Sequence, residues 1–208
     1  MTTQTHRTVL ATRPLGRWRT IDLLTCAFIG VAFGVAYWGW YLAYQVPSHA
    51  LEVVYPPLQG ITGAPWLMAG VVGGLVIRRP GAALFAELIA ACVEALIGSS
   101  WGIATVVSGV LQGLGAEIGF AILGYSSFGL GAAMLSGAMA APLEAVYEWF
   151  SYWTDWDWAY KLAYLVILTV SGALIAGGLG WLLTQGLARA GALGSLPPGQ
   201  EVREARAV

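Results

Sequence analysis

The chain has 208 residues, of which 58% are hydrophobic and 10% are charged, and its mean hydropathy is +0.70. Soluble domains carry about 25% charged residues, so this composition excludes an ordinary soluble domain and indicates an integral membrane protein. The net charge of −1 comes without a basic patch, so nothing predicts a nucleic-acid partner. Cys26 and Cys92 lie in separate apolar runs, which favours buried hydrophobic packing over a disulfide or a metal site.

The N-terminal segment, residues 1–20, is basic and polar. The apolar run that follows, Leu23 to Tyr44, is longer than the roughly 7–15 residues of a signal-peptide core. We therefore predict that this run is a retained membrane helix.

This first helix carries small residues one turn apart, Gly30 with Gly34 and Ala32 with Ala36. Small residues let two helices approach closely in a membrane. Packing within the protein and docking of another membrane protein explain the pattern equally well, so these four residues are candidates for a partner surface.

A helix needs about 20 apolar residues to cross a bilayer. By this measure the sequence predicts an all-α membrane domain over residues 21–187 that contains six transmembrane helices. The predicted helices cover about 21–45, 61–77, 81–97, 102–123, 128–150 and 159–187. Residues 188–208, with two adjacent prolines and scattered charges, are predicted to form a disordered tail.

Basic residues gather near one set of helix ends, which predicts the orientation of the protein in the membrane. Arginines lie in the N-terminal segment, in the turn at 78–79 and at position 189, whereas the opposite side has Glu52, Asp155 and Asp157 with Lys161 as its only basic residue. We therefore expect both termini to be cytoplasmic.

Three glutamates, Glu87, Glu94 and Glu117, lie inside apolar runs with no Lys or Arg between them. A carboxylate in hydrocarbon is costly unless it has a partner, so an intramembrane acid predicts a functional site. Because the sequence offers no cationic partner nearby, the ligand itself is a candidate partner.

The glutamates of the apolar runs are predicted to lie at different depths in the bilayer. At about 1.5 Å per residue, Glu94 and Glu144 both lie about 20 Å from the starts of their helices, in the outer third of a bilayer core of about 30 Å. Glu148 follows one turn later on the same face as Glu144. Glu87 lies deeper, where we expect a hydrogen bond with Gln112, and Glu117 lies deepest, where it caps a helix or contacts a neighbour.

Aromatic residues are abundant on the outer side, more than the usual interfacial belt of Trp and Tyr explains. We therefore predict a pocket of carboxylates and aromatic rings that opens to the outside. The candidate ligand-binding residues are Glu94, Glu144, Glu148, Tyr147, Trp101, Trp38, Trp66, Gln112 and Glu87.

Acids and aromatic rings without internal bases suit an organic cation. Aromatic faces add cation–π attraction of about 0.5–2 kcal/mol, and a carboxylate accepts paired hydrogen bonds from an aminopyrimidine-like edge. Cobalt and nickel sites usually recruit His or Cys, and the predicted spans contain no His. A carboxylate cage for a hard ion stays open as an alternative, but no metal site is predicted.

Catalysis has little support in the sequence. The chain has neither an HExxH motif nor a GxxxxGK[ST] loop, and its single lysine is Lys161. We therefore expect a protein that is not an enzyme, uses no cofactor and does not itself hydrolyse ATP.

One block of the sequence resembles the substrate-binding (S) components of energy-coupling factor (ECF) transporters, and within them the YkoE type. The residues that carry the resemblance are Arg79-Pro80-Gly81-Ala82-Ala83, Glu87, Glu94, Gly98, Ser108-Gly109 and Gln112-Gly113-Leu114-Gly115-Ala116-Glu117.

This resemblance implies a multi-pass protein of the bacterial cell membrane that captures thiamine, or its hydroxymethylpyrimidine precursor, outside the cell. It implies docking on a coupling membrane protein that is driven by two cytoplasmic ATPases. The spacing of Ala32 and Ala36 is similar to the small-residue motif that such components use for docking. The alternatives are a proton-coupled carrier with Glu87 or Glu117 as its proton site, and a cobalt or nickel uptake component.

Overall fold

The computed structural model describes residues 15–206, and within that range all regular secondary structure is helical. The elements are α1 (Thr20–Ala43), α2 (Gln45–Val54), η1 (Pro56–Gln59), α3 (Gly60–Gly63), η2 (Ala64–Leu67), α4 (Met68–Ile77), α5 (Ala82–Ile97), α6 (Ile103–Ile122), α7 (Leu130–Ser151), α8 (Trp158–Ser171), η3 (Gly172–Leu179), α9 (Gly180–Arg189) and α10 (Pro197–Arg206). Here η1 and η2 are 3₁₀-helices, and η3 is a π-helix that continues α8 into α9.

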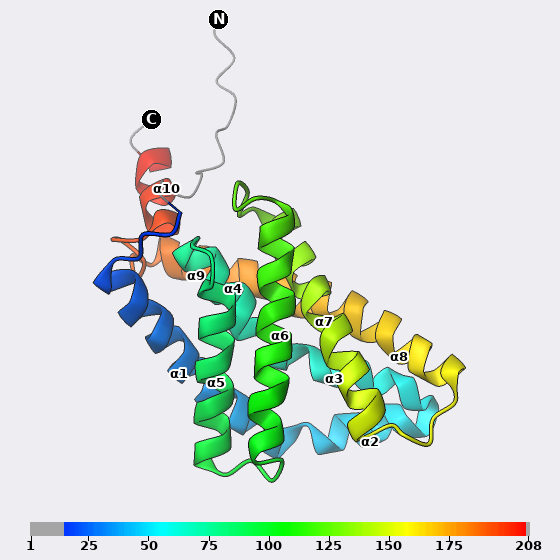
Figure 1. Cartoon of the computed structure of the whole chain (residues 1–208). Coiled ribbons are helices and arrows are strands. Elements are labelled where there is room, and N and C mark those ends of the chain that lie inside the picture. Colours follow the sequence, from blue (N-terminus) through cyan, green and yellow to red (C-terminus); the bar gives the residue numbers. More distant parts are fainter. Residues whose placement is uncertain (1–14, 207–208) are drawn as a thin grey trace, which may run out of the picture.

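The helices form a bundle in which α5 and α6 run side by side as a hairpin (Figure 1). Helix α1 packs against α5 on one side of this hairpin, and α7 packs against α6 on the other. The start of α1 and the whole of α10 lie at one end of the bundle, which we call the terminal end. The α5–α6 turn and helix α2 lie at the opposite end, which we call the far end.

Five stretches of the described chain are long and apolar enough to cross a membrane, which makes the protein a multi-pass membrane protein. They are Thr20–Ala43, Pro56–Ile77, Ile103–Ile122, Leu130–Ser151 and Trp158–Arg189. The remaining predicted span, 81–97, corresponds to α5, which has only 16 residues and buries two glutamates. The all-helical membrane fold is therefore confirmed, whereas the count of six spans is not.

Glycines on α1 allow close contact with α5. A Cβ atom added at Gly30 would lie 2.7 Å from the Cβ of Ile89, and one added at Gly34 would lie 2.5 Å from the Cβ of Val93. Internal packing therefore occupies these two glycines. Their neighbours Ala32 and Ala36 remain exposed.

The turn between α4 and α5, at the terminal end, contains two residues in the left-handed region, Arg78 with φ 56° and Gly81 with φ 88°. Gly81 occupies the N-cap position of α5 and has no side chain to cap the helix. Glu117 of α6 supplies the missing acceptor: one carboxylate oxygen accepts from the Gly81 N–H at 2.6 Å, and the other accepts from the Ala83 N–H at 2.9 Å. The predicted capping role of Glu117 is therefore confirmed.

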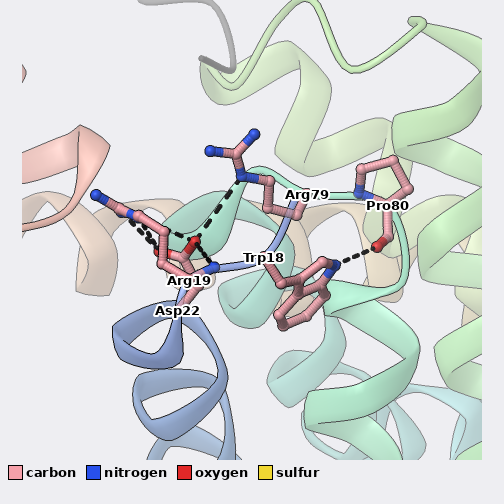
Figure 2. Close-up of polar contacts among 5 residues, drawn as sticks. All are labelled: Trp18, Arg19, Asp22, Arg79 and Pro80. Atoms are coloured by element: carbon pink, nitrogen blue, oxygen red, sulfur yellow. Dashed lines mark hydrogen bonds and ion pairs between the residues drawn. The ribbon is translucent and has the colours of Figure 1, made fainter. Parts of the chain in front are cut away.

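Hydrogen bonds and ion pairs connect the start of α1 to the same turn (Figure 2). The indole N–H of Trp18 donates to the carbonyl oxygen of Pro80 at 3.2 Å. Asp22, which is fully buried, lies 2.6 Å from a guanidinium nitrogen of Arg19 and 3.9 Å from Nε of Arg79. These contacts fix the distance between α1 and the α4–α5 hairpin.

The predicted disordered tail is wrong for most of its length, because α9 continues to Arg189 and α10 spans Pro197–Arg206. Two nitrogens of Arg78, whose side chain is 3% exposed, donate to the two carboxylate oxygens of Glu201, each at 2.8 Å. A buried guanidinium needs a carboxylate nearby, and the tail supplies one. Of the basic N-terminal segment, residues 1–14 lie outside the described residues.

Candidate ligand-binding site

A cavity of about 230 Å³ lies at the far end of the bundle, between elements from α1 to α8. Its wall is made of four glutamates, several aromatic residues and a set of neutral polar residues. The glutamates are Glu87, Glu94, Glu144 and Glu148; the aromatic residues are Tyr37, Tyr44, Trp66, Trp101, Tyr152, Trp153 and Tyr164; the neutral polar residues are Ser48, Gln59, Thr62, Thr105, Ser108 and Gln112. Within residues 15–206, those that line this cavity include neither Lys nor Arg.

Glu94, on α5, is held by one neutral donor. The indole Nε1 of Trp66 lies 3.1 Å from each of its carboxylate oxygens, so a single N–H is shared between them. The Glu94 side chain is 1% exposed. A carboxylate that is buried this deeply, and that faces one neutral donor among the described residues, keeps acceptor capacity for a ligand.

Glu144 and Glu148 lie one turn apart on α7 and face the same cavity. Ser108 of α6 donates to Oε1 of Glu144 at 2.7 Å, and Tyr164 of α8 donates to Oε2 of Glu148 at 2.5 Å. Within the described residues, Oε2 of Glu144 is buried and has no hydrogen-bond partner. An acceptor of this kind is costly to leave unpaired and so marks a place for a donor from a ligand.

Glu87 is the deepest glutamate of the cavity wall, and its carboxylate also binds the start of helix α4. Its Oε2 accepts from the backbone N–H of Gly70 at 2.7 Å and from the hydroxyl of Tyr37 at 3.3 Å, while that hydroxyl accepts from the backbone N–H of Ala69 at 2.7 Å. The first N–H groups of a helix have no partner within it. Glu87 and Tyr37 therefore cap the start of α4 inside the bundle.

The expected hydrogen bond between Glu87 and Gln112 is replaced by these contacts. Gln112 instead lines the same cavity as Glu144. The reason is that α4 begins only at Met68, so its unpaired N–H groups reach Glu87 first. Within the described chain, Oε1 of Glu87 is buried without a hydrogen-bond partner.

Aromatic rings enclose one side of the cavity. Tyr44, Trp66 and Trp101 form a triangle with ring centroids 5.2, 5.5 and 5.6 Å apart. Trp153, which also lines the cavity, stacks on the ring of Trp156 at a centroid distance of 4.3 Å. The rings thus provide flat apolar surfaces beside the carboxylates, an arrangement that favours a flat cation.

Seven of the nine predicted ligand-binding residues line this cavity, and two do not. The two outside are Tyr147, whose ring contacts Tyr152 at 6.3 Å, and Trp38, which follows the cavity-lining Tyr37 on α1. Sequence reasoning missed the tyrosines that bind the acids, Tyr37 and Tyr164. Their only sequence signal is that each is a hydroxyl-bearing residue within an apolar run.

Metal ligation has no geometric support among residues 15–206. No group of three or more His, Cys, Asp or Glu side chains in that range is arranged to hold a metal ion. The four glutamates share a cavity but are separately engaged by neutral donors.

Three comparisons with known proteins each found a membrane transport component. A family model described as "ABC-type cobalt transport system, permease component" matches residues 21–143. The putative HMP/thiamine permease protein YkoE of Bacillus subtilis (strain 168) is 34% identical over 195 residues, which cover 91% of this chain and 94% of the relative. A crystal structure of an S component of an ECF transporter superposes with a TM-score of 0.80 at 33% identity, covering 91% of this chain and 95% of that chain.

Proposed function

We infer that this chain, which belongs to the YkoE-type S components of ECF transporters, captures an organic cation from outside the cell. As a member of that family it is a transport subunit rather than an enzyme. The observation that carries the inference is the composition of the cavity wall, which has four glutamates and neither Lys nor Arg.

The charge balance supports a cationic ligand. Buried carboxylates are strongly disfavoured unless an opposite charge or several donors compensate them. The donors present are neutral: an indole, hydroxyls and one backbone N–H. A cation in the cavity would supply the missing charge, and the rings of Trp66 and Trp101 would add cation–π attraction of about 0.5–2 kcal/mol.

Within this class we propose thiamine or its hydroxymethylpyrimidine part as the ligand. The curated relative is named as an HMP/thiamine permease. An aminopyrimidine edge presents N–H donors, and the unpaired oxygens of Glu87 and Glu144 are acceptors that match them. The aromatic walls suit the flat rings of thiamine, and Glu94 suits the positive charge of its thiazolium.

We further propose that the terminal end is cytoplasmic, that α5 counts as the sixth span, and that an ECF coupling membrane protein with two ATPases is the partner. The arginines at the terminal end support this orientation, because basic residues favour the cytoplasmic side. The exposed pair Ala32 and Ala36 on α1 is the proposed docking position. Small exposed residues allow a partner helix to approach closely.

Calorimetry on the detergent-solubilised protein tests the ligand. We expect thiamine to bind, and Glu94→Gln to weaken binding by more than tenfold, because the change removes a desolvated counter-charge. Glu52→Gln is the matched control, since Glu52 is an exposed acid outside the cavity. Unchanged affinity in Glu94→Gln would remove Glu94 from the site, and no binding of thiamine or its precursor would contradict the proposed substrate.

Cobalt is the second candidate, because the matching family model is described as a cobalt transport permease. A thermal-shift screen that compares thiamine, hydroxymethylpyrimidine, Co²⁺ and Ni²⁺ separates the two. Stabilisation by Co²⁺ at micromolar concentration, without stabilisation by the organic ligands, would favour the metal. Uptake by the purified chain alone in liposomes under a pH gradient would favour a proton-coupled carrier instead.

A further inference from the structure

Helix α2 (Gln45–Val54) has three distinct faces at the far end of the bundle. One face meets the protein: Ser48 is buried, lines the cavity and donates to Oε1 of Gln59 at 3.2 Å. At about 100° per residue, the remaining positions divide into a polar side and an apolar side. Burial of the Ser48 face alone does not explain why the exposed polar and apolar residues of α2 are separated so clearly.

The polar side is narrow. Gln45, His49 and Glu52 fall within a sector of about 60°, as calculated from the helical repeat, and all three are exposed. His49 and Glu52 form a contact of 3.3 Å on this surface. These side chains need water, so this sector defines the direction in which α2 meets the aqueous phase.

The apolar side lies opposite the cavity. Val46, Val53 and Val54 are 79%, 75% and 77% exposed, and together with Ala50 they occupy a sector of about 100° that faces away from Ser48. A lid lying on top of the bundle would direct this outer surface into water. An apolar outer surface is the opposite of what such a lid requires.

The neighbouring surface identifies what covers this face. Helix α1 ends one residue before α2 begins, and its exposed apolar side chains continue to Leu42, which is 60% exposed. Helix α1 is a membrane-spanning stretch, so its exposed apolar surface is the one that meets lipid. Helix α2 follows directly on α1 at the far end of the bundle (Figure 1), so the apolar side of α2 lies next in the chain to this lipid-facing surface.

We propose that α2 is an interfacial helix immersed in the outer leaflet, with Val46, Ala50, Val53 and Val54 in contact with lipid acyl chains. Its polar side faces the aqueous phase, and its Ser48 side forms a lateral wall of the cavity. The cavity is therefore closed toward the lipid by α2, and a polar ligand enters past the polar side of the helix rather than beneath it. The proposal rests on the membrane fold and does not depend on the identity of the ligand.

Spin-label accessibility tests this placement. Single cysteines replace Ala50 and Val54 on the apolar side and His49 and Glu52 on the polar side, in a Cys92→Ala background that leaves the fully buried Cys26 unchanged. Each nitroxide-labelled protein is placed in phosphatidylcholine–phosphatidylglycerol vesicles. Collision rates with oxygen, which concentrates in lipid, are compared with those of a water-soluble nickel chelate.

Labels at positions 50 and 54 should collide with oxygen several-fold more than with nickel, and labels at 49 and 52 should show the reverse. Equal nickel access at all four positions would place α2 in water and overturn the proposal. Labels at 50 and 54 that are immobilised and shielded from both reagents would indicate a protein neighbour, such as a second copy of the chain, and would overturn it as well. All four positions are exposed, so the substitutions leave the packed core unchanged.

Discussion

Replacing Glu117 by Gln should destabilise the protein without removing its ligand site. Glu117 joins two helices at the terminal end: its carboxylate accepts from the N–H groups of Gly81, Ala83 and Leu84 at 2.6, 2.9 and 3.3 Å, and also from the hydroxyl of Tyr125. A glutamine keeps one carbonyl oxygen but turns an NH₂ group toward donors. At least one of these donors then loses its acceptor.

The magnitude follows from two contributions. A buried donor left without an acceptor costs about 1–3 kcal/mol, and the loss of a negative charge at a helix N-terminus costs about 0.3–2 kcal/mol. Together they give a loss of stability of about 1.3–5 kcal/mol. For a chain of this length, at about 2–4 °C per kcal/mol, this loss corresponds to a fall in Tm of about 3–20 °C.

Thermal unfolding of the purified protein in detergent measures this change, and Glu204→Gln provides the control because Glu204 is an exposed acid on α10. Ligand affinity in Glu117→Gln should stay within about threefold of the parent at a temperature where both are folded, since Glu117 does not line the cavity. A Tm within about 1 °C of the parent would refute the capping argument. A large loss of affinity at unchanged Tm would show that Glu117 acts on the ligand instead.

Three further changes test other contacts. Tyr164→Phe removes the hydroxyl that donates to Glu148, and calorimetry should record an affinity about three- to tenfold weaker, from a net hydrogen-bond contribution of about 1 kcal/mol; equal affinities would show that this bond does not position the acid. Glu201→Gln removes the carboxylate bound to the buried Arg78 and should lower the Tm by several degrees, whereas an unchanged Tm would mean that α10 adds no stability. Gly137→Ala places a Cβ against the backbone of η3, and size-exclusion chromatography should show little monodisperse protein; a normal yield would mean that α7 and η3 can separate at small cost.

The sequence predicts the main acids of the site because the regular geometry of a helix fixes how far along its axis, and on which face, each residue lies. Glu94 and Glu144 lie at similar distances from their helix starts, and Glu148 follows Glu144 by one turn, so three carboxylates are expected near one layer. The same reasoning is less accurate for aromatic residues. Tyr147 and Trp38 are each one position away from a residue that lines the cavity, and one position on a helix rotates a side chain by about 100°.

The partners of the acids could not be predicted, because they depend on where helices begin. The apolar run at 61–77 indicates one continuous span, yet residues 56–67 form three short elements before α4 starts at Met68. The N–H groups of Ala69 and Gly70 are free to bind Tyr37 and Glu87 only because of this interruption. Hydropathy reports how apolar a segment is, and it carries no signal for such a break.

The C-terminal helix shows a different limit. Arg78 and Glu201 are separated by 123 positions in the chain, and neither position has a local pattern that indicates the other. Prolines and scattered charges indicate disorder by composition, but Leu193 and Leu196 are buried among residues of α1, α4 and α5. A short segment can be ordered by two buried leucines and one ion pair, and a composition average does not detect so few contacts.

The start of α4 also changes the electrostatic field inside the cavity. The N-terminus of a helix carries a partial positive charge of roughly half an elementary charge, and that of α4 points at Glu87 beside the cavity. The deepest carboxylate is therefore partly neutralised by the backbone, and the attraction is strongest nearer to Glu94, Glu144 and Glu148. For the organic cation proposed above, such a gradient would favour the charged part near Glu94, Glu144 and Glu148 and the neutral part beside Glu87, and it would give a compact divalent ion less advantage than four free carboxylates would.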